Sequence, residues 1–277
     1  DNVWEIPKSG DMKVPTRIFA SEKLLEKMKQ DRSLQQAKNV ACLPGIYKYA
    51  CVMPDGHEGY GFPIGGVAAL DVKTGGISPG GIGYDINCGV RLLQTNLTKE
   101  QMYPKIKDLL DALFKSVPAG LGGSNITVTT EVLDGLLNNG AKWAVENGYG
   151  NQDDLDHCES NGCMEQADAS RVSDKAKNRG RKQLATLGSG NHFLEIQYVD
   201  EIYDVETAKA FGITEKDQVV LMIHCGSRGL GHQVCSDYLR EMERTFPEII
   251  AKIPDKELIY APAGHKLCDD YLKAMSA

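Results

Sequence analysis

Residues 80–91 read Gly-Gly-Ile-Gly-Tyr-Asp-Ile-Asn-Cys-Gly-Val-Arg, a stretch in which four glycines surround one carboxylate and one thiol. Glycine has no Cβ, so the backbone can adopt positive φ and come close to a ligand. Asp85 and Cys88 stand three residues apart, so a tight turn can direct both side chains into one space. An oxygen donor beside a sulfur donor suits a divalent cation such as zinc, manganese, iron or cobalt. Taken alone, the same spacing also fits a glycine-rich turn with a buried structural cysteine and a capping aspartate.

Two further glycine-rich turns lie beside predicted strands and carry histidines. Residues 187–196 contain a Gly-Ser-Gly turn that delivers His192 to the start of a strand. The apolar run 219–223 predicts a buried strand, which ends in His224 and is followed by a glycine turn, a serine and an arginine. A lone histidine on an apolar strand is more often a core residue than a ligand. Three such turns together favour one shared metal site, with Asp85, Cys88, His192 and His224 as its donors.

Local patterns predict the elements around these turns. Ser21 is expected to cap a helix over 21–32. Thr98 and Gln101 form a capping box that opens a helix to residue 117, interrupted or started late at Pro104. We also expect an edge strand or an incoming loop within 1–20, buried strands over 67–72 and 90–97, helices over 131–146 and 229–244, and a core-facing stripe of Leu109, Leu110, Leu113 and Phe114.

Composition sets limits on the class of protein. The chain has 277 residues, 42% hydrophobic and 25% charged, which is an ordinary globular composition with enough length for a sizeable core. The net charge of −7 argues against bulk nucleic-acid binding but leaves room for a local basic patch. No apolar run approaches a membrane span and the first residues carry no signal-peptide pattern, so we expect a cytoplasmic protein without a membrane partner. Its eight cysteines are then expected to be reduced.

One segment of this acidic chain is strongly basic. Six cations fall within residues 171–182, on a predicted helix that Ser173 caps. Such a run is usually a solvated helix face. Its position just before the turn that carries His192 favours a second interpretation, a surface that contacts the phosphate backbone of a nucleic acid.

A polar segment over 147–163 contains His157, Cys158 and Cys163. The simplest interpretation is an exposed insertion loop. A small structural metal clip or a disulfide remains an alternative, and the sequence does not assign a role to these three residues.

Four motifs together resemble the RtcB family of RNA-splicing ligases, over essentially the whole chain. They are Pro-Asp-Gly-His-x-Gly-Tyr-Gly-Phe at 54–62, Ser-Pro followed by the opening stretch at 78–91, Gly-Ser-Gly-Asn-His-Phe at 188–193, and His-x-Gly-Ser-Arg-Gly at 224–229. The resemblance implies an α+β fold with mixed sheets and surrounding helices, in a single catalytic domain over 1–277.

The resemblance also implies an activity. Members of the family join an RNA 3′-phosphate or 2′,3′-cyclic phosphate end to a 5′-hydroxyl end, with GTP and Mn²⁺. A histidine is guanylylated first, the guanylate passes to the RNA 3′-phosphate, and the 5′-hydroxyl displaces GMP. The implied substrates are tRNA halves, and archease is a candidate helper.

Matching positions carry the family's roles onto this sequence. Asp85 and Cys88 are expected to bind metal, with Cys88 bridging two Mn²⁺ ions. His192 resembles the ligand of one ion and His224 the ligand of the other. The segment comprising Asn191, His192, Phe193, Leu194 and Glu195 resembles the guanylate contact, and Arg179 resembles an arginine that holds RNA phosphate.

Family members continue well beyond the position of Ala277, into a region with another metal-binding histidine and the guanylylated histidine. His232 and His265 follow His224 here, but neither lies in that nucleophile motif. We therefore expect an N-terminal portion that is inactive alone, with no catalytic nucleophile among its residues. Two other function classes stay open: a metal-dependent phosphoesterase, and a metal-stabilised RNA-binding protein without turnover.

Overall fold

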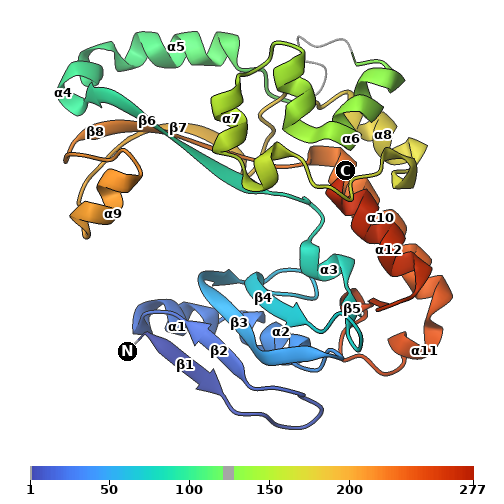
Figure 1. The fold of residues 1–277 in the computed structure, drawn as a ribbon. Coiled ribbons are helices and arrows are strands. Elements are labelled where there is room, and N and C mark those ends of the chain that lie inside the picture. Colours follow the sequence, from blue (N-terminus) through green and yellow to red (C-terminus); the bar gives the residue numbers. More distant parts are fainter. Residues whose placement is uncertain (1, 121–127) are drawn as a thin grey trace. The chain divides into compact units, whose positions relative to one another are not determined.

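The computed structural model describes residues 2–120 and 128–277 (Figure 1). They form two compact units, each treated by itself. Unit 1 comprises Asp1–Tyr84, Glu131–Ala176 and Gly231–Ala277, and unit 2 comprises Asp85–Thr130 and Lys177–Leu230. The predicted α+β class is confirmed, because helices accompany three separate sheets. The single catalytic domain stays a prediction.

Unit 1 is built on a mixed four-stranded sheet in the order β1-β2-β3-β4. Strand β2 pairs in parallel with β3, and the other two pairings are antiparallel. Helices α1 (Glu22–Met28) and α2 (Ser33–Val40) pack against β3. Burial of their apolar faces builds the core of this unit. The strands are β1 (Val3–Ile6), β2 (Thr16–Phe19), β3 (Ile46–His57) and β4 (Ile64–Leu70).

Local signals placed the start of the first helix correctly, although α1 ends at Met28 and the prediction ran to Arg32. The Ser21 side chain accepts a hydrogen bond from the backbone N–H of Leu24 and caps α1, as predicted. Strand β1 forms the outer edge of the sheet, which confirms the edge strand expected within 1–20.

The expected buried strand over 67–72 is partly wrong. Strand β4 ends at Leu70, Val67 is 54% exposed and Val72 is 85% exposed. Successive strand residues point to opposite faces. Ala68 and Leu70 pack on the core, whereas Val67 lies on the other face of an edge strand.

Further elements complete the two units. The helix predicted over 131–146 is α6 (Thr130–Glu146), and the one predicted over 229–244 is α10 (Arg228–Thr245). The basic run contributes α8 (Asp174–Arg181), where Ser173 Oγ accepts from the N–H of Ala176 and confirms the predicted cap. The remaining elements of unit 1 are β5 (Gly76–Ile77), β9 (Ala261–Pro262), α3 (Pro79–Ile82), α7 (Gln152–Asp156), α11 (Pro247–Ile250), α12 (Lys266–Ser276) and the short 3-10 helices η2 (Glu159–Gly162), η3 (Ala169–Arg171) and η4 (Lys256–Leu258).

Unit 2 is built on a three-stranded antiparallel sheet in the order β6-β8-β7. Its strands are β6 (Gly89–Thr98), β7 (Phe193–Tyr198) and the central β8 (Gln218–Cys225). The expected burial of residues 90–97 is wrong, since Val90 is 55% and Leu92 is 48% exposed. Strand β6 lies at the edge of this sheet. Its apolar run shows that its surface is suited to burial, but it does not show that another segment packs against it. Helix α9 (Val205–Ala210) follows β7.

The predicted capping box opens a helical segment after β6. Thr98 accepts from the N–H of Gln101, whose side chain accepts from the N–H of Thr98. Pro104 interrupts the segment as expected, which divides it into α4 (Lys99–Met102), η1 (Tyr103–Lys105) and α5 (Ile106–Ser116). The predicted core face is wrong: α5 has no buried residue, and Phe114 is 89% exposed. Within the described ranges, no helix is both long and apolar enough for a membrane crossing.

Candidate metal centre

Strand pairing in unit 2 brings three separate turns to one end of the sheet. Gly89, the first residue of β6, pairs with Cys225, the last residue of β8. Cys88 therefore lies just before β6, next to the end of β8. Phe193 pairs with His224, so His192 lies just before β7 at the same level. Antiparallel pairing thus brings together two side chains that are 136 positions apart in the sequence, Cys88 and His224.

The donor atoms of these residues converge. Cys88 Sγ lies 3.0 Å from His224 Nε2 and 3.6 Å from His192 Nε2. The three ligand atoms all lie within 4.8 Å of one another and form a candidate metal-binding group. One thiol and two imidazoles are donors that zinc, manganese, iron and similar cations accept. The donor set therefore fits a divalent metal ion.

Asp85 joins the cluster through His192. Its Oδ2 lies 2.7 Å from His192 Nε2, and its Oδ1 accepts hydrogen bonds from the N–H of Arg228 at 3.0 Å and the hydroxyl of Ser227 at 3.5 Å. The turn after β8 is fastened to the Asp85 turn by a further bond, from Ser227 N–H to Ile86 C=O. All four predicted metal ligands thus meet at one place, while their role as ligands stays a prediction.

The Cys88 thiol is poorly disposed to ionise without a cation. Partial burial, followed by the Asp85 carboxylate, raises the pKa of the thiol to about 12. A cation would reverse this preference, because a coordinated thiol binds as the thiolate.

Arg228 is a site residue to which the sequence analysis gave no role. Its guanidinium lies 3.4 Å from His192 Nδ1. The guanidinium, which only donates, thus faces the Nδ1 side of the His192 ring, while Nε2 faces Asp85 and Cys88. Its backbone φ of 58° is rare for a residue with a side chain. The signal was present in the 224–229 motif, but nothing in a linear sequence shows that this arginine turns back towards His192.

Two glycines leave room for the cluster. A Cβ at Gly226 would lie 2.5 Å from Asp85 Oδ2. A Cβ at Gly188 would lie 2.4 Å from His192 Nδ1, and Gly188 also has a φ of 107°. The carbonyl of Leu187 accepts from the Cys225 thiol at 3.0 Å, which ties this turn to β8. Both glycines are required for close approach, and Gly188 is also required for its backbone conformation.

The predicted guanylate segment begins at the cluster and then leaves it. The Phe193 ring lies edge-on to His224 with centroids 5.3 Å apart. Asn191 is exposed in the turn, Leu194 is half-buried, and Glu195 is exposed and accepts from Gln197. The structure thus brings His192 and Phe193 to the cluster, and the nucleotide-binding role of the segment stays a prediction.

Arg179 lies in unit 2 together with the cluster. Its Nε would be 3.4 Å from a Cβ placed on Gly229, so the arginine lies against the first turn of α10. The preceding residue, Arg228, contacts His192. The predicted RNA-phosphate contact is therefore near the candidate metal centre, although its role is untested.

The 147–163 segment is not the plain loop that was expected. It contains α7, which Asn151 caps and whose Leu155 is buried. Cys158 and Cys163 do not form a disulfide. Among the described residues, possible metal ligands converge in the group of Cys88, His192 and His224, and His157 belongs to no such group.

Comparison with known proteins gives a consistent result. The sequence model described as tRNA-splicing ligase RtcB matches residues 36–277. A tRNA-splicing ligase RtcB of Thermococcus kodakarensis is 62% identical over 261 residues, which cover 94% of this chain and 54% of that protein. The protein of the same name in Nanoarchaeum equitans is 55% identical over 276 residues, which cover 99% of this chain and 57% of the relative. The chain spans about half the length of the curated relatives it matches.

Proposed function

Because the chain belongs to the RtcB family of tRNA-splicing ligases, we propose that the full-length protein is an RNA ligase. It joins ends that carry a 3′-phosphate or a 2′,3′-cyclic phosphate to ends that carry a 5′-hydroxyl. The reaction uses GTP and proceeds through a protein-histidine guanylate. Its substrates are RNA, with tRNA halves as the first choice, archease as a candidate helper and the cytoplasm as the expected compartment.

The observation that carries the proposal is the convergence of Cys88, His192 and His224 from three turns within 4.8 Å. Two ions at such a centre would neutralise phosphate charge and orient the attacking and leaving oxygens. Manganese is the metal that we propose. Cys88 is central to the three donors, which suits a bridging thiolate between an ion on His192 and an ion on His224.

The remaining residues position substrates in this proposal. Asp85 is held by Arg228 N–H and Ser227, so its carboxylate stays directed at the His192 side of the centre. The guanylate lies along Asn191 and the segment Phe193, Leu194 and Glu195. Arg179 holds an RNA phosphate beside the start of α10.

Ligation by the full-length protein tests the proposal. RNA with a 3′-phosphate and RNA with a 5′-hydroxyl are incubated with Mn²⁺ and GTP, and the joined product is measured. Cys88→Ala should remove the ligation and lower manganese affinity at least about tenfold. Cys51→Ala, which removes a half-buried cysteine of unit 1, should preserve both. Removal of the terminal phosphate without joining, or ligation that survives Cys88→Ala, would contradict the proposal.

A further inference from the structure

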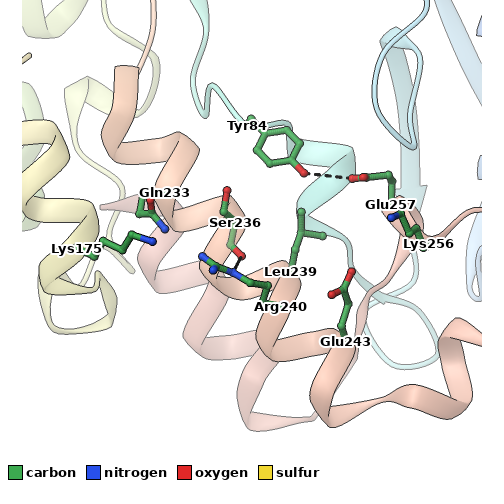
Figure 2. A pocket seen from close by; sticks show the side chains of 9 residues that line it. All are labelled: Tyr84, Lys175, Gln233, Ser236, Leu239, Arg240, Glu243, Lys256 and Glu257. Atoms are coloured by element: carbon green, nitrogen blue, oxygen red, sulfur yellow. Dashed lines mark hydrogen bonds between the residues drawn. The ribbon is translucent and has the colours of Figure 1, made fainter.

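Unit 1 contains a polar pocket alongside α10 that has no role so far. Its volume is about 360 Å³, within the size range of small-ligand sites. Figure 2 shows Lys175 at one end, Lys256 and Glu257 at the other, and Arg240 between them on the helix. We call it the α10 pocket. All of its lining residues belong to unit 1, so the pocket is complete within that unit.

Three cations line the α10 pocket along its length. Arg240 donates to Asp237 and to the carbonyl of Ser236, which fixes the arginine against its own helix. Lys175 and Lys256 are exposed and form no ion pair with any residue that the structure describes. Charged groups left unpaired in a concave surface attract an oppositely charged ligand.

Two carboxylates that lie beside Arg240 and Lys256 limit which anion can bind. Glu257 accepts a hydrogen bond from the Tyr84 hydroxyl at 3.3 Å, and Glu243 lies one turn of α10 beyond Arg240. Burial, followed by Glu257, raises the pKa of Tyr84 to about 12, so the phenol keeps the proton that it donates. The carboxylates would repel a bare anion, so a ligand that suits the pocket brings hydrogen-bond donors together with its negative charge.

Lys175 also belongs to the basic run that predicted a phosphate-contacting surface. We propose that the α10 pocket binds a ribonucleotide unit of a single-stranded RNA substrate. Lys175 and Arg240 hold its phosphate, Lys256 holds the phosphate of the next nucleotide, and Glu243 and Glu257 accept hydrogen bonds from ribose hydroxyls. This inference rests on the proposed RNA ligase function and adds a second RNA contact to that of Arg179. Tyr84 is bonded to Asp85, so the pocket and the candidate metal centre share one stretch of sequence.

The choice of RNA over DNA follows from the carboxylates. The 2′-hydroxyl is a donor that RNA has and DNA lacks, and it lets a protein tell the two apart. In a site for phosphate alone, Glu243 would repel the ligand. In a metal site, the lysines would repel the cation. A strand that offers successive phosphates and the hydroxyls between them satisfies both the cations and the carboxylates of the pocket.

Binding of a fluorescent twelve-nucleotide RNA without reactive ends tests the inference, with a DNA of the same sequence as the comparison. The full-length protein is used, at several salt concentrations. The double variant Lys175→Gln and Lys256→Gln should weaken RNA binding about two- to fivefold for each lysine. The logarithmic salt dependence should become shallower by about 0.7 for each lost phosphate contact. Glu243→Gln should reduce the preference for RNA over DNA and leave the salt dependence unchanged.

A matched control separates the pocket from general charge. Lys252→Gln removes an exposed lysine four residues before Lys256 and outside the α10 pocket, and RNA affinity should stay at the wild-type value. RNA affinity that is equal in the wild type and the double variant, while ligation proceeds, would overturn the pocket inference alone. Displacement of the labelled RNA by free AMP at equal concentration would also overturn it, because the pocket would then serve a mononucleotide. Absence of RNA binding by the wild type would overturn the proposed function as well.

Discussion

Gly188 and Gly190 lie two residues apart in one turn and differ in how closely other atoms approach them. Both have positive φ, 107° and 70°. A Cβ at Gly188 would come within 2.9 Å of the Arg228 guanidinium as well as 2.4 Å from His192, whereas a Cβ at Gly190 meets open space. Substitutions at the two glycines therefore distinguish the effect of backbone conformation, which both share, from the effect of close approach to the candidate metal centre, which only Gly188 has.

Alanine at each of these glycines gives a matched test. Both Gly188→Ala and Gly190→Ala should destabilise the fold by about 1–2 kcal/mol, because an L side chain disfavours positive φ. Only Gly188→Ala should also displace His192 and weaken metal binding by about tenfold or more. Calorimetric titration with Mn²⁺ and thermal unfolding measure the two effects. Equal metal affinity in both variants would refute the positional role of Gly188.

Capping at Thr98 is a local effect at the scale of one element. Thr98→Ala removes the side chain that accepts from Gln101 N–H, so the free energy of unfolding should fall by about 1 kcal/mol. Thr98→Ser retains the hydroxyl and should recover most of the loss. Urea unfolding followed by circular dichroism measures the difference. Identical midpoints for the alanine and serine variants would show that the capping box contributes nothing to stability.

The basic helix α8 allows a second test at the scale of an element. In the full-length protein, Arg179→Ala should weaken RNA binding and make its salt dependence shallower, because a phosphate contact is lost. Protein guanylylation with labelled GTP should change little, since that step precedes RNA. Unchanged RNA affinity would make the 171–182 run an ordinary solvated helix face.

At the scale of the whole molecule, guanylylation requires a nucleophilic imidazole, metal on the triphosphate and a guanine pocket together. Two of the six histidines, His192 and His224, are assigned to metal in our proposal. If the nucleophile lies outside residues 1–277, as the family resemblance implies, these residues with Mn²⁺ and labelled GTP should form no acid-labile protein–GMP adduct, because no other group can form the protein–guanylate bond.

The control for this guanylylation assay is a chain extended to the full length of its relatives. This longer chain should form the adduct, and its Cys88→Ala variant should not. Gel autoradiography after acid and base treatment measures both. A stable adduct on residues 1–277 that maps to His232 or His265 would show that the nucleophile had been assigned to the wrong region.

Local chemistry was readable from the sequence because it depends on neighbours along the chain. The caps at Ser21, Thr98 and Ser173 and the kind of donors at the candidate metal centre follow from residue type and short spacing. The family likewise follows from contiguous motifs, and the match over residues 36–277 agrees with it. Side-chain type and a turn or a helix start are encoded within a few residues.

The tertiary structure decided what depends on distant parts of the chain. Pairing of β6 and β7 with β8 sets Cys88 3.0 Å from His224, and only the folded turn directs Arg228 at His192. The burial of Phe114 was predicted wrongly. An apolar stripe shows that a helix face is suited to burial, but it does not show which segment, if any, packs against that face. Strand register and burial are properties of contacts between segments far apart in sequence, so no local pattern determines them.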